Sequence, residues 1–368
     1  WIYVGHASEV PEPGDYKTAI IGHNPVIVSH AEDGEIYVLL NECRHRGVAV
    51  CREAFGNSES FQCPYHGWVY ANSGELTGVT YPGGYPDGFA SELGGLLKLR
   101  SAIYRGLIFA SINDNVPSIE DHLGDVRKYV DLWADLSPEP EFIVARPHLY
   151  GYQGNWKLQA ENGADGWHAR FVHASAFETQ AAYGGRPTRH FSNGITRGFD
   201  NGACILDRPG IIQGLSDEQR EDIRQRLLTR HSPERLEQIW RIRHILLFPN
   251  VYLFDNLIRV IQPVSVDRTN VLSHPFHLRG VSEAYNRLRL PELQSRLGTT
   301  GMVGPDDLEM FAATQTGIQG AKMRWIVLSH GMAEDQQAEG SEVVGDDTSE
   351  IPQRAIYRHW AMMMGGDE

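Results

Sequence analysis

Residues 155–175 read NWKLQAENGADGWHARFVHAS, and this stretch places two imidazoles close to a carboxylate. Asp165 precedes His168 by three residues, and His173 follows His168 by five. Two neutral imidazoles and one carboxylate, with one face of the ion left open, are the ligand set of non-haem Fe(II) enzymes that activate dioxygen. His168 and His173 are therefore candidate iron ligands. For H-x4-H taken alone, the competing interpretation is a pair of ordinary histidines on an amphipathic helix.

The spacing of these histidines constrains the backbone that carries them. On an ideal helix, residues five apart are rotated by roughly 140° and do not share a small ion. The H-x4-H spacing therefore predicts a π-bulge or a frayed turn at this point, and such distortions are common at functional sites.

A third iron ligand is expected to be a carboxylate from another part of the chain. Residues 304–311, GPDDLEMF, offer Asp306 and Asp307 at the start of a predicted helix, with Pro305 in its first turn. The alternative is that both acids only complement the positive end of the helix dipole. These residues alone leave the choice between the two aspartates open.

Upstream of this stretch, the first hundred residues consist of short alternating runs broken by turn residues, such as EIYVLL at 35–40. Asp33-Gly34 and Ser73-Gly74 occur where hairpin turns need positive φ. This pattern predicts a small antiparallel β-domain in residues 1–112.

Residues 113–368 mix helical and strand-like segments. An acidic turn after Ser118 predicts an amphipathic helix to about residue 134. Residues 246–254 are expected to form one strand of a pair. Residues 340–350 are the one segment expected to be weakly structured. The mixture predicts an α+β fold: an N-terminal all-β domain followed by a catalytic domain with a central antiparallel sheet wrapped by helices.

Two short loops in the β-domain combine cysteine with histidine, as C-x-H and C-x-x-H. Their four candidate metal ligands are Cys43, His45, Cys63 and His66. A structural Zn site would accept these ligands, and so would a Rieske [2Fe-2S] cluster, in which two cysteines hold one iron and two histidines the other. Gly47 and Gly67 favour the cluster, because its sulfurs need close backbone N–H groups.

With these motifs in place, the chain resembles the large (alpha) subunit of Rieske non-haem iron aromatic-ring-hydroxylating oxygenases over nearly its whole length. The motifs are C-x-H-R-G, C-P-Y-H-G-W and, at 161–168, ENGADGWH, which is nearest the benzoate-type dioxygenase branch. The resemblance implies a [2Fe-2S] Rieske cluster in the first domain and mononuclear Fe(II) on His168, His173 and an aspartate of the late helix. The downstream Gln315-Thr316-Gly317 favours Asp307 over Asp306.

The resemblance also implies roles for two residues that do not bind iron. Asp165 is expected to hydrogen-bond His168 and a Rieske histidine of a neighbouring subunit, which makes it an electron bridge between chains. A carboxylate in this position also orients a metal-bound imidazole. Asn162 is expected to approach the open side of the iron, with a packing role as the alternative. The need for a neighbour implies a trimer of large subunits.

The activity implied is cis-dihydroxylation of an aromatic ring, an aromatic carboxylate of benzoate type, by a terminal oxygenase. O2 is the co-substrate, and electrons from NAD(P)H arrive through a reductase, a ferredoxin or both. A small (beta) subunit in an α3β3 assembly is expected, with α3 as the other possibility. Two alternatives stay open: a Rieske monooxygenase, either a hydroxylase or an O- or N-demethylase, and a Rieske electron-transfer protein without catalytic iron.

Four residues are candidates for binding the substrate. The apolar ones are Phe171, Leu253 and Leu257, although such residues are also ordinary core. Arg259 interrupts an apolar strand, and a guanidinium among apolar residues needs an anionic partner. That partner is either an internal acid, such as Asp255 or Asp267, or the carboxylate of a substrate.

Composition excludes several classes of protein. The 368 residues carry a formal net charge of −14, which argues against a nucleic-acid binder. No apolar run approaches the roughly 20 residues that span a bilayer, so no membrane partner is expected. Only four cysteines occur, too few for a disulfide scaffold, and a cytoplasmic location is expected.

Overall fold

The computed structural model describes residues 1–140, 142–183, 194–210, 216–298, 300–320, 322 and 325–365. The chain divides into two compact units, Trp1–His122 and Leu123–Glu368. The first is built of β-sheets, and the second combines one large antiparallel sheet with helices, so the predicted α+β fold class is confirmed. Within the described part, no helix is long and apolar enough to cross a membrane.

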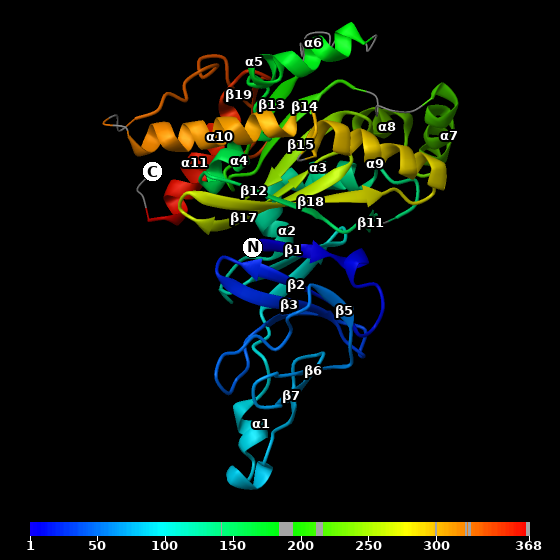
Figure 1. The fold of residues 1–368 in the computed structure, drawn as a ribbon. Helices are drawn as coiled ribbons and strands as arrows, with labels where there is room; N and C mark the ends of the chain where they lie inside the picture. The colour runs from blue at the N-terminus through cyan, green and yellow to red at the C-terminus, as the bar shows by residue number, and fades with distance from the viewer. Residues whose placement is uncertain are drawn as a thin grey trace. The chain divides into compact units, whose positions relative to one another are not determined.

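The first unit holds three antiparallel sheets, with strand orders β1-β10-β9, β4-β3-β2-β5 and β6-β7-β8 (Figure 1). The strands are β1 Ile2–His6, β2 Asp15–Ile21, β3 Asn24–His30, β4 Ile36–Leu40, β5 Phe55–Asn57, β6 Ser60–Gln62, β7 Val69–Ala71, β8 Leu76–Gly78, β9 Arg100–Tyr104 and β10 Leu107–Ser111. The predicted turns are confirmed, because Gly34 (φ 86°) and Gly74 (φ 102°) lie within the β3–β4 and β7–β8 connections and have positive φ.

Two apolar clusters hold this unit together. One packs β3 side chains, including Val26 and Val28, against Ile108 and other residues of the neighbouring sheet. The other surrounds Cys43 and Cys63 with aromatic and aliphatic side chains, so both cysteines are buried inside a packed core. The loops that carry the cysteines are therefore anchored by their first residue.

The second unit is organised around a sheet with the strand order β11-β18-β17-β16-β15-β14-β13-β20-β19, and β12 also pairs with β18. All pairs are antiparallel. The strands are β11 Ile143–Val144, β12 His148–Tyr152, β13 Ile195–Gly198, β14 Cys204–Arg208, β15 Ile242–Leu247, β16 Val251–Leu253, β17 Leu257–Ser265, β18 Arg268–His277, β19 Gln336–Gln337 and β20 Val343–Asp346.

Helices wrap this sheet, as predicted (Figure 1). The α-helices of the described residues are α1 Phe89–Leu93, α2 Ile119–Leu123, α3 Arg127–Ala134, α4 Trp156–Asn162, α5 Ala169–Val172, α6 Ala174–Ala182, α7 Asp217–Leu228, α8 Pro233–Ile239, α9 Glu283–Leu297, α10 Gly304–Gln319 and α11 Ile351–Met363. Helix α4 contacts β17, α11 contacts β13 and β14, α3 contacts β15, and α10 contacts β12. Helices α4 and α10, which carry candidate site residues, are thus fixed to neighbouring parts of one sheet.

Three segments differ from the sequence predictions. The helix expected after Ser118 is interrupted at Gly124, whose φ is 49°, and continues as α3. The single strand expected at 246–254 is two strands, β15 and β16, because Phe248, Pro249 and Asn250 make the turn between them. The 340–350 segment is not weakly structured: it contains β20, and buried Glu342 binds Lys128 at 2.8 Å.

Candidate active site

The 155–175 stretch folds as three short helices separated by turns. Asn155 caps α4, because its side chain accepts a hydrogen bond from the Lys157 N–H at 3.2 Å. His168 immediately precedes α5, and His173 lies between α5 and α6 with φ −103° and ψ 21°. The predicted local break is confirmed as a turn between helices rather than a π-bulge. This turn brings both imidazoles to the same side.

Both imidazoles meet one carboxylate of α10. The Nε2 atoms of His168 and His173 lie 3.5 Å and 3.3 Å from Oδ1 of Asp307. Among the described residues, these three form the one group of histidine, cysteine and acidic side chains whose ligand atoms all lie within 4.8 Å of one another. Two imidazoles and a carboxylate that converge on one point fit a mononuclear Fe(II) ion.

Asp306 lies behind His173 rather than at this shared point. Its Oδ2 is 3.4 Å from Nδ1 of His173, so each ring nitrogen of His173 faces a carboxylate. Burial lowers the pKa of His173, but Asp307 and Asp306 outweigh burial and raise it above its ordinary value. A metal-bound imidazole commonly gives its other N–H to a carboxylate that fixes its tautomer. The two adjacent aspartates therefore occupy different positions in the site.

Asp165 and Asn162 contact the histidine–carboxylate group without belonging to it. Asp165 Oδ1 accepts hydrogen bonds from the N–H groups of Trp167 at 2.6 Å and His168 at 3.1 Å. Burial acts to raise the pKa of Asp165, but His168 and these N–H donors outweigh it and lower the pKa. Nδ2 of Asn162 lies 3.3 Å from Nε2 of His168 and 3.2 Å from Oδ1 of Asp307. Both residues thus hold the site's geometry from within the same chain.

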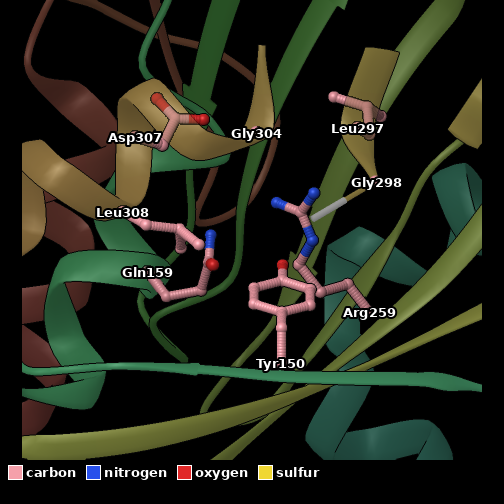
Figure 2. Close-up of a pocket in the computed structure, with 8 residues that line it drawn as sticks. All are labelled: Tyr150, Gln159, Arg259, Leu297, Gly298, Gly304, Asp307 and Leu308. Carbon is pink, nitrogen blue, oxygen red and sulfur yellow. The ribbon is translucent and has the colours of Figure 1, made fainter. Parts of the chain in front are cut away.

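A pocket opens beside Asp307, with an empty volume of about 270 Å³ that includes its opening to solvent (Figure 2). Its lining comes from β12, α4, β17, the end of α9 and the start of α10, namely Tyr150, Gln159, Arg259, Leu297, Gly298, Gly304, Asp307 and Leu308. The site therefore joins a candidate metal point to a small pocket lined by polar and apolar side chains.

The pocket contains one of the four predicted substrate residues, Arg259. Phe171, by contrast, is 72% exposed and lies away from the pocket lining. For Phe171, Leu253 and Leu257, a role in substrate binding stays a prediction. Leu253 and Leu257 are fully buried in the sheet and also lie outside the lining. The reason is that β16 and β17 are apolar where both faces of the sheet are covered, and hydrophobicity alone does not separate core from pocket.

The sequence interpretation missed the other lining residues. Gln159 could have been found, because it lies one helical turn before Asn162 on α4 and so shares its face. Gly304 could have been found as well, since it starts the helix that carries Asp307. Leu297 and Gly298 gave no signal, because they approach the pocket only through tertiary packing of α9.

The two cysteine–histidine loops of the first unit have matching backbone geometry. Cys43 N–H donates to Val48 O at 2.9 Å, and Gly47 N–H donates to Cys43 O at 2.8 Å. In the second loop, Cys63 N–H donates to Trp68 O at 2.8 Å, and Gly67 N–H donates to Cys63 O at 3.0 Å. Gly47 and Gly67 have φ values of 75° and 73°, which favour glycine.

These loops fit a two-iron cluster better than a single zinc ion. Cys43 and Cys63 are buried, whereas His45 and His66 are partly exposed, with ring centroids 4.5 Å apart. Nδ1 of His45 is buried and has no hydrogen-bond partner among the described residues, as expected for an atom that binds metal. The four donors do not converge within 4.8 Å, as a tetrahedral Zn site would require. The arrangement fits a [2Fe-2S] centre with mixed ligands.

Comparison with known proteins gives matches over both units. The family model described as the Rieske [2Fe-2S] domain matches residues 1–87, and the model of the ring hydroxylating alpha subunit (catalytic domain) matches residues 129–366. The alpha subunit of toluate 1,2-dioxygenase from Pseudomonas putida is 35% identical over 342 residues, which cover 88% of this chain and 75% of the relative. The large subunit of anthranilate 1,2-dioxygenase from Acinetobacter baylyi is 34% identical over 358 residues, which cover 90% of this chain and 75% of the relative.

A solved structure agrees with these matches. Naphthalene 1,2-dioxygenase from Rhodococcus sp., bound to indole, superposes with a TM-score of 0.85 at 28% identity, covering 99% of this chain and 89% of that one. The predicted family, fold and cofactors are thereby confirmed, with a [2Fe-2S] cluster and a mononuclear iron in one chain. The chain belongs to the alpha subunits of the Rieske non-haem iron ring-hydroxylating dioxygenases, which are oxidoreductases.

Proposed function

We propose that this chain is the terminal oxygenase subunit that cis-dihydroxylates an aromatic carboxylate, with O2 as co-substrate and electrons that originate from NAD(P)H. The observation that carries the proposal is the meeting of His168, His173 and Asp307 at the edge of a pocket that also contains Arg259. A ligand set for iron and a cation for the substrate thus share one space. The names of the relatives, which act on toluate and anthranilate, support an aromatic acid as substrate.

In this proposal, His168, His173 and Asp307 hold the mononuclear iron, and Cys43, His45, Cys63 and His66 hold the cluster. When bound, these groups supply electron transfer and O2 activation at a metal with open coordination positions. Asp306 keeps His173 in the tautomer that leaves Nε2 free for metal. Asn162 stays within hydrogen-bonding distance of His168 and Asp307, where it restrains both side chains.

Asp165 is proposed to connect the two metal centres across a subunit boundary. All of its hydrogen bonds within the described chain use Oδ1, and its side chain is 29% exposed. Oδ2 is therefore available to His66 or His45 of a neighbouring copy. A carboxylate that binds an imidazole on each side can fix the orientation of both.

The proposal includes partners and a compartment. A reductase, a ferredoxin or both deliver electrons, and a small (beta) subunit completes an α3β3 assembly, as is usual in this family. Residues 1–112 are assigned to the cluster and 113–368 to the mononuclear iron. All four cysteines are buried and unpaired, which suits a reducing cytoplasm.

The test is turnover of the assembled holoenzyme under 18O2, with an electron donor and three substrates: benzoate, toluene and methoxybenzoate. We expect benzoate to give a cis-dihydrodiol that carries two 18O atoms. Loss of the methoxy methyl group, or a product with one 18O atom from every substrate, would assign the chain to monooxygenation instead. Iron-loaded enzyme that oxidises none of the three would contradict the proposed aromatic substrate.

A further inference from the structure

Arg259 is a buried cation that has no acidic partner among the residues that the structure describes. It is 6% exposed and lies in β17, where its neighbours across the sheet are Tyr252 and Ser273. Its Nε is buried without a hydrogen-bond partner, and no carboxylate of the described residues lies within the 4.0 Å of an ion pair. The guanidinium instead lies over the Phe254 ring, 4.9 Å from its centroid. Neither Asp255 nor Asp267, the internal partners considered from the sequence, forms an ion pair with Arg259.

A buried guanidinium in this state is energetically costly unless something else neutralises it. Removing an ion from water is energetically costly, and a single ring contact offsets only part of this cost. The guanidinium lines the pocket beside Asp307. The missing anion is therefore expected to enter through the pocket.

Two neutral polar groups lie beside the guanidinium. Figure 2 shows the Tyr150 hydroxyl directed toward Arg259 and the Gln159 amide directed into the same space from α4. Burial raises the pKa of Tyr150, although the Arg259 charge partly opposes this, so the hydroxyl keeps its proton and can donate. No hydrogen bond of the Gln159 amide occurs within the described chain, and Gln159 is 2% exposed. All three groups can donate hydrogen bonds to an anion.

We propose that Arg259, the Tyr150 hydroxyl and the Gln159 amide form a carboxylate subsite that holds an aromatic acid beside the mononuclear iron ligands. A guanidinium binds a carboxylate through two parallel hydrogen bonds, which fixes the plane of the substrate as well as its position. The inference rests on the proposed function and deepens it, because it assigns the recognition of the acid to named side chains.

The test compares two substrates of similar shape, benzoate and nitrobenzene, of which only benzoate carries a negative charge. In Arg259→Gln holoenzyme, kcat/KM for benzoate should fall by roughly tenfold or more relative to nitrobenzene, because only benzoate loses a charge-assisted pair. For Arg259→Lys, kcat/KM for benzoate relative to nitrobenzene should lie between the values of wild type and Arg259→Gln, because lysine keeps the charge but cannot form the bidentate pair. Calorimetric titration of benzoate into anaerobic holoenzyme should show the same order of Kd values without any turnover.

Tyr150→Phe gives a second readout that does not disturb the buried charge. It should raise the Kd for benzoate severalfold and leave that for nitrobenzene unchanged. The matched control is Tyr152→Phe, two residues along the same strand, whose hydroxyl donates to Asn155 O at 3.2 Å instead of facing the pocket. This control should not alter the preference for benzoate.

Equal losses on both substrates in Arg259→Gln and Tyr150→Phe would overturn the subsite and assign Arg259 to the scaffold. If Arg259→Gln does not fold, as judged by its melting temperature and cluster absorbance, Tyr150→Phe alone decides between these outcomes. Failure of the proposed function would look different: wild-type holoenzyme would neither bind nor oxidise benzoate, whatever the variants do.

Discussion

At the scale of single residues, the adjacent acids Asp306 and Asp307 give a sharp prediction. Asp307 lies near both Nε2 atoms, whereas Asp306 contacts only Nδ1 of His173. Asp307→Ala should therefore lose the mononuclear iron and all turnover. Asp306→Ala should keep the iron but bind it roughly 10- to 100-fold more weakly, because the tautomer of His173 is no longer fixed. Metal analysis should show about three irons per chain falling to about two in Asp307→Ala alone.

The sequence could not separate these two roles. Both acids occupy the first turn of α10, where either could have served only the helix dipole. Glu309→Ala, on the exposed side of the same helix, is the matched control and should leave iron content unchanged. Loss of iron from Asp306→Ala but not from Asp307→Ala would mean that the ligand assignment is shifted by one residue.

At the scale of elements, the sequence predicted those features whose geometry depends on only a few neighbouring residues. The glycine turns of the first unit, the break at His173 and the helix after Pro305 follow from backbone preferences that only a few residues decide. The α4 cap at Asn155 is equally local, because one side chain satisfies one N–H of the first turn. These elements carry the candidate metal ligands, so local sequence patterns were enough to propose both metal sites.

The pocket was less predictable because it depends on how elements meet. Arg259 was identified by its contrast with the apolar residues around it in β17. Tyr150 reaches the same space only because β12 and β17 flank β18 in the sheet, with Tyr150 opposite Val271 and Arg259 opposite Ser273. Strand order and register depend on tertiary structure, and the alternation of residues within one strand does not predict which residues of other strands lie opposite.

Helix α4 carries a further ionisable group with a testable pH dependence. Burial raises the pKa of Glu161 to about 7, and the nearby Asp165 charge adds to this effect. Because the folded pKa exceeds the unfolded one, the folded state binds more protons between about pH 4.5 and 7. This contribution to stability is fully present below that window and is lost as pH rises through it.

Glu161→Gln should remove this dependence, because the amide stays neutral at every pH. Above pH 7 the variant should be more stable than wild type by up to roughly 3 kcal/mol, while near pH 4.5 the two should be similar. The measurement is the free energy of unfolding by denaturant at pH 5, 6, 7 and 8. Glu237→Gln, at an exposed position of α8, should parallel wild type. If the Glu161→Gln curve also parallels wild type, the raised pKa is wrong.

At the scale of the whole molecule, each chain carries ligands for both metal centres, one set in each unit. The proposed path of electrons nevertheless joins the cluster of one chain to the iron of its neighbour. Its support is the free Oδ2 of Asp165, since Oδ1 already accepts both N–H groups of its own turn. A ring of such head-to-tail contacts closes a cyclic oligomer, and a trimer is the assembly that we propose.

Mixing two inactive variants tests this path. Cys63→Ser removes the cluster but keeps the iron, and Asp307→Ala removes the iron but keeps the cluster, so neither homo-oligomer should turn over. In trimers assembled from an equal mixture, an intact iron has an intact cluster in the adjacent chain at about a quarter of all positions. Transfer between chains therefore predicts recovery of about a quarter of wild-type turnover after co-expression. Transfer within one chain predicts none, because no chain in the mixture carries both centres. Adding Asp165→Ala to the Cys63→Ser chain should abolish the recovered turnover without changing metal content, since this chain supplies the working iron and its bridge.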